Sequence, residues 1–516
     1  MKYLFPVLLA LVNTLSAIAK QYDVCIYGGT SAGIVAAKAV AESGKTVLIV
    51  EPSRHLGGLT TGGLGQTDMG RNQQLQGIAR QFYRDIGIHY GEQEKIVFEP
   101  KVATAVFARY LSHPKIHVMS SCGLKRVHKR GGRIIALTVA TLDENCQFTA
   151  RSSRIRAKVF IDASYEGDLM ALAGVSFTTG RESADTYGES WNGAHLAKYH
   201  QFPDGVDPYV VPGDPSSGLL WGISSADAPE SGCGDTLIQA YNLRLCLTDS
   251  TANSLPLSEP SHYDASRYEL LARLIQAQKP TAKYFIWSPM PGRKTDVNNY
   301  GGFSTDLIGG NLNYLEATYA QRKQIYNEHS EYIKGLLWFM MTDTRVPNSL
   351  SQEISRWGRP LDEYPGNDHW TPQLYVREGR RMLGDYVVTQ ADCEHRTTAP
   401  DGIAEAAYMM DSHNCQRIVI HKNGKAMVKN EGDVEIKIPG PYPISYRAIV
   451  PKRGECTNLI VPVCLSASHI AYGSVRMEPV FMTLGEVSAR AAVLAIQRKS
   501  PVQDVDWKEI SLIAKK

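Results

Sequence analysis

A glycine-rich turn close to the N-terminus has the residue types and spacing of a phosphate-binding loop. A largely apolar run over 22–27 predicts a buried strand, and an alanine-rich segment over 34–43 predicts a helix. Between them stand six residues that we predict to contact a dinucleotide, namely Gly28, Gly29, Thr30, Ser31, Ala32 and Gly33. Gly28 permits a tight turn, Gly33 lets the helix pack closely on the strand, and the helix N-terminus attracts a pyrophosphate.

An acidic residue stands where a nucleotide-binding fold places its ribose acceptor. Residues 45–50 predict a second strand, and Glu51 follows it, 18 residues beyond Gly33. This separation is close to the roughly 20 residues of the dinucleotide fingerprint, in which the carboxylate accepts hydrogen bonds from ribose. Thr30 replaces the middle glycine of that fingerprint. The complete order of strand, loop, helix, strand and acid still predicts a Rossmann-type unit.

The segment after Glu51 favours FAD over NAD. Arg54 is followed by Gly57 and Gly58, so the order is acid, arginine, glycine pair. This order resembles the second FAD fingerprint of the glutathione reductase-like flavoproteins, in which the glycines let the chain pass close to an extended dinucleotide. The resemblance implies that Arg54, Gly57 and Gly58 contact FAD, and a flexible surface loop is the alternative. His55 either packs within this loop or carries the flavin covalently, as a histidine does in some distantly related flavoproteins.

A second block downstream resembles the same superfamily. Short apolar runs over 116–139 predict a meander of strands, and 157–164 predicts a buried strand that ends in a polar turn. The resemblance implies that the backbone near Leu124 faces the adenine. It also implies that Ala163 and Ser164 lie near the dinucleotide.

From Asp23 onward the chain is similar to a bacterial family known as FAD-dependent oxidoreductases, whose members are often exported. The resemblance rests on the segments 28–33, 54–58, 160–169, 239–246, 375–382, 411–413 and 472–479. It implies an FAD cofactor and redox chemistry but supplies no substrate. Some members have been labelled putative xanthan lyases, a label that we do not carry over because lyase chemistry needs no dinucleotide. The run 484–490 departs from the family, so Glu486 and Arg490 are either surface changes or alter the packing beside the flavin.

These features predict an α/β protein with a Rossmann-type FAD-binding domain in two segments, 20–174 and 441–500. An apolar strand over 458–465 and a final helix over 480–498 mark the return of the chain to this domain. In the resembled superfamily such a helix points its N-terminus at the flavin, whose reduced form is an anion. The intervening residues 175–440 predict an inserted mixed α+β cap or substrate domain.

Four residues are candidates for chemistry on the substrate, namely His413, His469, Arg476 and Arg380. Either histidine is a candidate base that removes a hydroxyl proton while the flavin takes hydride, and a structural, hydrogen-bonded histidine is the alternative. Arg476 leads into the final helix and faces the flavin or a substrate oxygen. Arg380 shares one face of a predicted helix with Arg377 and Arg381, as a clamp for a polar substrate or in salt bridges.

The composition and the N-terminal segment bear on the partners, the localisation and the metal content of the protein. The 516 residues carry a net charge of +3 with no basic run interleaved with aromatics, which gives no indication of a nucleic-acid partner. Residues 1–19 have the positive start, apolar run and small residues of a cleaved signal peptide, which predicts export to the periplasm or secretion. Beyond this segment we predict no membrane span, and no cysteine or histidine spacing indicates a metal site.

The sequence leaves the reaction partly open. A small organic substrate gives hydride to flavin N5 in the predicted reaction, and oxidation of a hydroxyl or of an amine would both fit. Export and the tryptophans are compatible with a carbohydrate-derived substrate. The electron acceptor is not identified. Two alternatives stay open, an NAD-dependent dehydrogenase and a secreted glycan-binding or lyase-like protein with a vestigial nucleotide fold.

Overall fold

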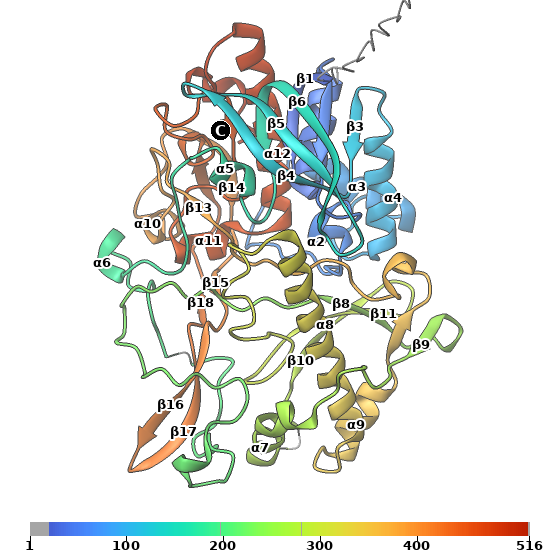
Figure 1. The fold of residues 1–516 in the computed structure, drawn as a ribbon, viewed down its shortest axis with the longest axis vertical. Coiled ribbons are helices and arrows are strands. Elements are labelled where there is room, and N and C mark those ends of the chain that lie inside the picture. Colours follow the sequence, from blue (N-terminus) through green and yellow to red (C-terminus); the bar gives the residue numbers. More distant parts are fainter. Residues whose placement is uncertain (1–19, 197, 280, 514–516) are drawn as a thin grey trace, which may run out of the picture.

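The computed structural model describes residues 20–196, 198–279 and 281–513. The predicted signal peptide, residues 1–19, lies outside the described residues. A seven-stranded sheet organises one half of the molecule and a five-stranded sheet the other (Figure 1). The helix α8 (Tyr319–Thr342) begins beside the first sheet and runs into the second half.

The seven-stranded sheet contains the predicted Rossmann-type unit. Its strands are β1 (Lys20–Tyr27), β2 (Val47–Val50), β3 (Ile116–Met119), β4 (Cys122–Arg130), β5 (Arg133–Leu142), β6 (Phe148–Asp162) and β20 (Leu459–Ile460). Their order is β3-β2-β1-β6-β5-β4, with β20 also paired to β6. Strand β6 pairs antiparallel with β5 up to residue 155, and from there on it pairs in parallel with β1 and β20. The predicted α/β fold with a parallel, Rossmann-like sheet is therefore confirmed.

Helices pack against one face of the parallel strands of this sheet. The β4–β5 meander, which continues the sheet beyond β6, packs against their other face. Val24 and Ile26 of β1 pack with the helices, whereas Cys25 and Tyr27 pack with the meander. The helices are α1 (Ser31–Glu42), α3 (Gly77–Tyr90), α4 (Pro100–Leu111) and α12 (Glu478–Arg498). Helices α1 and α12 touch closely, because a side chain at Gly485 would collide with the carbonyl of Ala32. Among the described helices, only α12 is long and apolar enough to cross a membrane, and 78% of its apolar window is buried in the protein.

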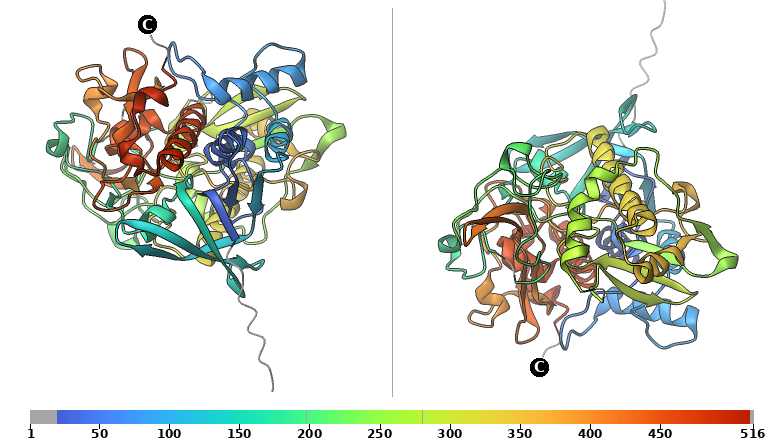
Figure 2. Two further views of the ribbon diagram at one scale, coloured as in Figure 1. Left: turned by 90° about the horizontal axis from the view of Figure 1, so that it is seen from above. Right: turned by 90° about the horizontal axis from the view of Figure 1, so that it is seen from below.

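The second half is built on an antiparallel sheet flanked by helices (Figure 2). Its strand order is β10-β11-β8-β12-β9. The strands are β8 (Leu245–Thr248), β9 (Ser254–Pro256), β10 (Phe285–Met290), β11 (Lys294–Asn299) and β12 (Gly358–Pro360), and the helices are α7 (Glu269–Ala277), α8 and α9 (Asn348–Ser355). A capping box between Thr318 and Gln321 fixes the start of α8.

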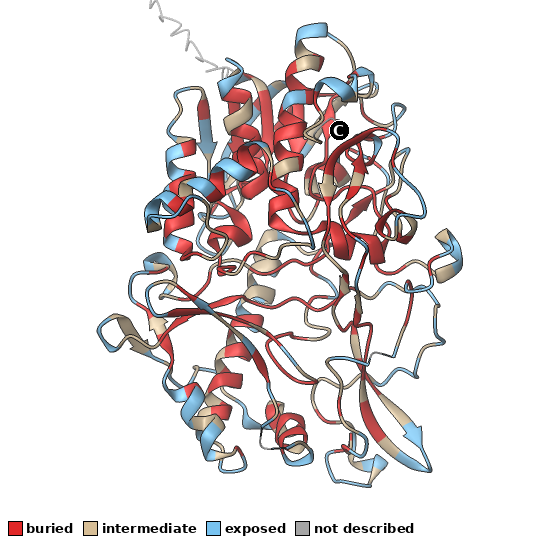
Figure 3. Ribbon diagram, turned by 180° about the vertical axis from the view of Figure 1, so that it is seen from behind, coloured by how far each residue is buried: buried red, intermediate tan, exposed pale blue. Residues whose placement is uncertain are grey.

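The remaining chain forms two-stranded ribbons and short helices. The paired strands are β7 (Phe177–Thr178) with β13 (Arg381–Met382), β14 (Gly402–Ala406) with β19 (Tyr442–Ser445), β15 (Met410–Ser412) with β18 (Val434–Ile436), and β16 (Gln416–Lys422) with β17 (Lys425–Glu431). The short helices are α2 (Gly58–Thr61), α5 (Asp168–Leu172), α6 (Ala184–Tyr187), α10 (Gln390–Cys393) and α11 (His469–Val475). Much of this irregular chain is buried (Figure 3), so side-chain hydrogen bonds must hold it.

The helix predicted over Arg377–Arg381 is wrong. Residues 376–380 have no regular structure, and Arg381 begins β13. A side chain at Gly379 would collide with the carbonyl of Tyr165, so the chain is pressed against the end of the Rossmann half. Both arginines at the ends of this segment are buried in ion pairs, which replace the helical hydrogen bonds that the spacing predicted.

Four other elements differ from the predictions or were not predicted. The strand predicted over 458–465 shortens to β20, because Pro462 lacks the N–H that a ladder needs. His469 begins the short helix α11, which was not predicted and whose N-cap Ser468 accepts a hydrogen bond from Ala471 N. Helices α3 and α4 were not predicted from the sequence.

Candidate cofactor and active site

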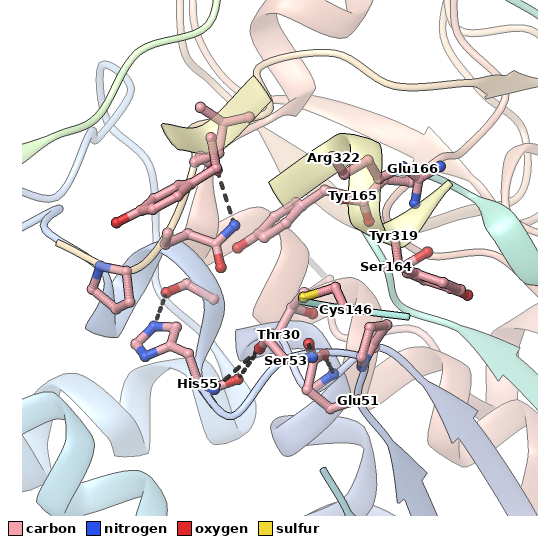
Figure 4. Close-up of a pocket in the computed structure, with 18 of the residues that line it drawn as sticks. Thr30, Glu51, Ser53, His55, Cys146, Ser164, Tyr165, Glu166, Tyr319 and Arg322 are labelled. Atoms are coloured by element: carbon pink, nitrogen blue, oxygen red, sulfur yellow. Dashed lines mark hydrogen bonds between the residues drawn. The ribbon is translucent and has the colours of Figure 1, made fainter. Parts of the chain in front are cut away.

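A cavity lies at the carboxyl end of β1, over the predicted dinucleotide loop (Figure 4). Six of the predicted cofactor residues line it, namely Gly28, Gly29, Thr30, Glu51, Gly58 and Ser164. The facing wall comes from the second half and includes Tyr319, Arg322 and Gln373. In open α/β sheets, ligands bind at this end of the strands.

Two glycines are required by close packing around this cavity. Gly28 has a φ of +100°, and a Cβ atom there would lie 2.5 Å from the amide nitrogen of Ser164. Gly58 has a φ of +57°, and its Cβ would collide with the hydroxyl of Tyr165. A side chain at either position would be strained and would displace the cavity wall.

Glu51 is held in place by two backbone amides. Its Oε2 accepts from Gly29 N at 2.7 Å, and its Oε1 accepts from Ser53 N at 2.8 Å. Burial raises the pKa of Glu51. A carboxylate has about four lone-pair sites, so each oxygen can still accept a hydroxyl from a ligand.

Thr30 takes over structural roles in place of the glycine that it replaces. Its hydroxyl donates to the carbonyl of Ala163 at 2.7 Å and accepts from Gly33 N at 3.3 Å as the N-cap of α1. The side chain is thereby fixed to the wall of the cavity, which accounts for threonine at this position.

Glu478, at the start of α12, ties the two ends of the chain together. Its carboxylate accepts from Ser31 Oγ at 2.5 Å, Thr60 Oγ1 at 2.6 Å and Tyr165 Oη at 2.7 Å. The group is buried, and burial raises its pKa. Glu478 was not among the predicted site residues, although it lies in the segment 472–479 that carries part of the family resemblance.

His413 directly follows β15 and forms a dyad with Asp306. Its Nδ1 lies 2.7 Å from Asp306 Oδ2, so Nδ1 carries the proton and Nε2 presents a lone pair. The carboxylate oxygen Asp411 Oδ2 lies 4.0 Å from Nε2. Burial, and then the Arg377 guanidinium, lower the pKa of His413, which favours the neutral ring. The side chain is 13% exposed.

His469 is differently placed, because both of its ring nitrogens have partners. Nδ1 lies 2.8 Å from Glu378 Oε2, and Nε2 lies 3.1 Å from Ser412 Oγ. The side chain is 2% exposed. Since Ser412 precedes His413, this pair positions the strand end that presents the first histidine.

Arg476 bonds both Tyr375 and Asp411, and Asp411 lies beside His413. Its Nη1 donates to Tyr375 Oη at 3.0 Å, and its Nη2 donates to Asp411 Oδ2 at 3.0 Å. Gln373 and Leu374, which line the far end of the cavity, directly precede Tyr375. We call His413, Asp306, Arg377, Asp411 and Arg476 the His413 network.

Arg380 is held by ion pairs and backbone carbonyls, among them the carbonyl of Glu166 at the cavity. Its Nη1 bonds Asp168 Oδ1 at 2.9 Å, and its Nη2 bonds the carbonyl of Leu315 at 2.5 Å. The structure therefore places it in the salt-bridge alternative, linking α5 to the segment before α8.

Comparison with known proteins agrees with this geometry. The model of a family described as FAD dependent oxidoreductase matches residues 23–513, nearly the whole chain. The chain belongs to this family. Its cofactor is FAD, and it is an oxidoreductase rather than a glycan-binding protein. No curated protein matches the sequence.

Solved structures resemble only part of the chain. THI4 from Thermovibrio ammonificans is 21% identical with a TM-score of 0.24, and the match covers 33% of this chain and 71% of that one. Mycobacterium smegmatis Sdh1, solved with UQ1, is 12% identical with a TM-score of 0.23, over 32% of this chain and 41% of that one. L-proline dehydrogenase from P. horikoshii is 16% identical with a TM-score of 0.19, over 32% and 25%. Likeness at this level carries no argument about substrate.

The cavity of this flavoprotein fits its cofactor. The close glycine turn admits a pyrophosphate at the N-terminus of α1, and Glu51 stands where ribose hydroxyls need an acceptor. The remaining predicted cofactor residues do not line the cavity, namely Ser31, Ala32, Gly33, Arg54, Gly57, Leu124 and Ala163. Arg54 is exposed, and the amide of Leu124 donates to Tyr319 Oη at 2.9 Å.

Four residues that line the cavity were not predicted from the sequence. Tyr319 and Arg322 of α8, and Tyr165 and Glu166 after β6, line the cavity. Tyr165 and Glu166 lie in a segment quoted for the family resemblance, which was the available signal. Nothing in the sequence alone indicated that α8 would reach the Rossmann half.

Proposed function

We propose that this flavoprotein oxidises a small organic substrate at a hydroxyl-bearing carbon, with His413 as the base. The observation that carries this proposal is the Asp306–His413 dyad, which leaves a neutral imidazole with Nε2 free to accept a proton. In the reaction His413 Nε2 takes the hydroxyl proton as the carbonyl forms. FAD, when bound, supplies the acceptor for the hydride that leaves the carbon.

The rest of the network supports this role. Asp306 fixes the ring and its tautomer, while Arg377 lies 2.9 Å from the other oxygen of Asp306, an ion pair without hydrogen-bond alignment. Arg476 holds Asp411 beside the imidazole. A protonated His413 would be stabilised by these carboxylates after proton transfer.

Anaerobic reduction of the holoenzyme by a panel of alcohols tests the proposal. The purified protein should show the usual flavin bands at about 370 and 450 nm. The His413→Gln variant should keep these bands but be reduced about 10²- to 10⁴-fold more slowly. Reduction of the variant at the wild-type rate would overturn the assignment of His413, and so would the absence of reduction by every alcohol.

Acid precipitation of the same sample tests how FAD is held. His55 Nε2 lies 2.9 Å from the carbonyl of Gly58 and 3.0 Å from Thr61 Oγ1, so its ring is engaged in the loop. We expect the yellow colour in the supernatant. Colour that stays in the pellet would make His55 the attachment residue.

A further inference from the structure

A second group of titratable residues lies next to His413. The rings of His200 and His413 have centroids 6.5 Å apart. One ligand atom each from His200, Asp433 and Glu435 lie within 4.8 Å of one another. We call these three residues the Asp433 cluster.

The β15–β18 ribbon brings the cluster to the His413 network. Asp411 of β15 stands directly opposite Glu435 of β18 in the antiparallel register. Like charges opposite one another destabilise a ribbon unless each has a counter-charge. Arg476 provides it for Asp411 at 3.0 Å, and His200 Nε2 lies 3.0 Å from Glu435 Oε1.

Asp433 is the carboxylate that lacks such a partner. It is 7% exposed, and its Oδ1 is buried with no hydrogen bond in the described part of the chain. Burial raises its pKa to about 8 although the nearby His200 lowers the pKa, and three more carboxylates face it, those of Asp411, Glu435 and Asp306. A buried carboxylate in this setting either holds a proton or pairs with a cation supplied from outside the chain.

The geometry of His200 disfavours a metal ion as that cation. Gly301 N donates to His200 Nδ1 at 3.0 Å, so the neutral ring carries its proton on Nε2 and donates it to Glu435. A metal-binding histidine has the opposite arrangement, with the metal on one nitrogen and an N–H donated from the other. An ammonium group requires only acceptors, which the Asp433 and Glu435 carboxylates provide.

We propose that the Asp433 cluster binds a protonated amine on the substrate, so that the substrate is an amino alcohol such as an amino sugar. This proposal rests on the proposed function, since it places the amine beside the hydroxyl-directed base His413. The Glu435 side chain is 31% exposed, which gives the cluster an edge toward solvent. The bound ammonium would donate to Asp433 Oδ1, the atom that has no hydrogen-bond partner among the described residues.

Calorimetric titration of the holoenzyme tests this with ligands matched in skeleton and different in charge. The probes are glucosamine, glucose and glucuronate, and ethanolamine, ethylene glycol and glycolate. We expect saturable binding of the cationic member of at least one set, tighter than its neutral and anionic counterparts. The anionic probes are included because two buried arginine nitrogens, Arg377 Nε and Arg476 Nε, also have no hydrogen-bond partner among the described residues and could attract an anion instead.

Three variants locate the binding. In Asp433→Asn the affinity for the cationic probe should fall roughly 30-fold or more, as expected when one partner of a buried charge pair is removed. Glu435→Gln should have a smaller effect because this group is partly exposed and already paired. Asp227→Asn, an exposed carboxylate, should have none.

Several outcomes would overturn the proposal. They are equal binding of neutral and cationic probes, preference for the anionic ones, no binding of any cation, unchanged affinity in Asp433→Asn, or a stoichiometric metal ion that is lost in His200→Gln. These results are independent of the alcohol-reduction experiment. If cations bind but His413→Gln is reduced at the wild-type rate, the proposed function fails and the cation site stands.

Discussion

The cofactor cavity and the His413 network are built by different means. The cavity's inner wall comes from residues 28–30 and from residues within the segment 51–58, and it is shaped by glycines, backbone amides and hydroxyls. The His413 network draws its charged side chains from five separated positions between 306 and 476 and is held by ion pairs. The first depends on backbone conformation, whereas the second depends on charge balance. Substitutions should therefore affect cofactor content in one region and reaction rate or pH response in the other.

The largest effect is expected at Gly28. Alanine there would adopt a φ of +100° and place its Cβ 2.5 Å from Ser164 N, so the wall of the cavity must shift. We expect Gly28→Ala to retain less than roughly a tenth of the wild-type FAD, given strain of about 1–3 kcal/mol and the added clash. The flavin-to-protein absorbance ratio measures this. Gly440→Ala is the control, because a Cβ at Gly440 meets no atom within 4 Å. Full flavin content in Gly28→Ala would show that backbone conformation does not limit this cavity.

The two histidines give the next contrast. His413→Gln should slow flavin reduction about 100-fold or more, because it removes the proposed base, and loss of the Nδ1 bond to Asp306 should also cost roughly 1–3 kcal/mol of stability. His469→Gln should slow reduction less than about tenfold but cost roughly 1–3 kcal/mol of stability, because it breaks buried bonds to Glu378 and Ser412. Thermal unfolding and anaerobic reduction of both variants check this. If His469→Gln lost rate with its stability unchanged, the base would be His469.

The same division explains how much the sequence predicts. The turn at Gly28, the acid at Glu51 and the final helix are local patterns with fixed spacing, and the structure has the strand, loop, helix and strand in that order. Thr30 at the glycine position did not mislead, because its hydroxyl serves as the N-cap of α1.

Long-range contacts account for the rest. His413 was named as a candidate from its neighbours, but its partner Asp306 lies 107 residues away and no pattern links them. The spacing of Arg377, Arg380 and Arg381 predicted a helix face, yet these residues form ion pairs in three directions, to Asp306, Asp168 and Glu182. Buried ion pairs therefore override local helix propensity in this segment, which packs closely against Tyr165 at Gly379.

The unpaired Asp433 should respond to pH in a predictable direction. Its ordinary pKa is 3.8, and burial raises the pKa in the folded protein to about 8. A raised carboxyl pKa means that the folded protein loses stability as pH rises from the lower value to the higher one. Asp433→Asn removes this penalty.

The melting temperature of Asp433→Asn relative to wild type should therefore increase between pH 5 and pH 8, by the equivalent of up to a few kcal/mol. His200, Glu435, Asp411 and Asp306 face the same carboxylate and are present in both proteins, so they cancel to first order. If the difference in melting temperature stayed constant across this range, Asp433 would have a counter-charge in the free protein, and it would not be the unpaired carboxylate of the cluster.

The smallest effect is expected at Glu486 and Arg490. Glu486 Oε2 accepts from Ile78 N at 2.6 Å, at the first turn of α3, and Arg490 pairs with the other oxygen at 2.5 Å. The carboxylate thus caps a helix N-terminus. Removing the cap in Glu486→Ala should cost about 1 kcal/mol of stability. In Arg490→Ala, whose side chain is 42% exposed, the loss should stay within about 1 kcal/mol and fall as salt rises. Both variants should bind FAD with wild-type affinity, measured by quenching of flavin fluorescence. Weaker FAD binding in either one would place these residues in the packing beside the flavin and extend the cofactor region along α12.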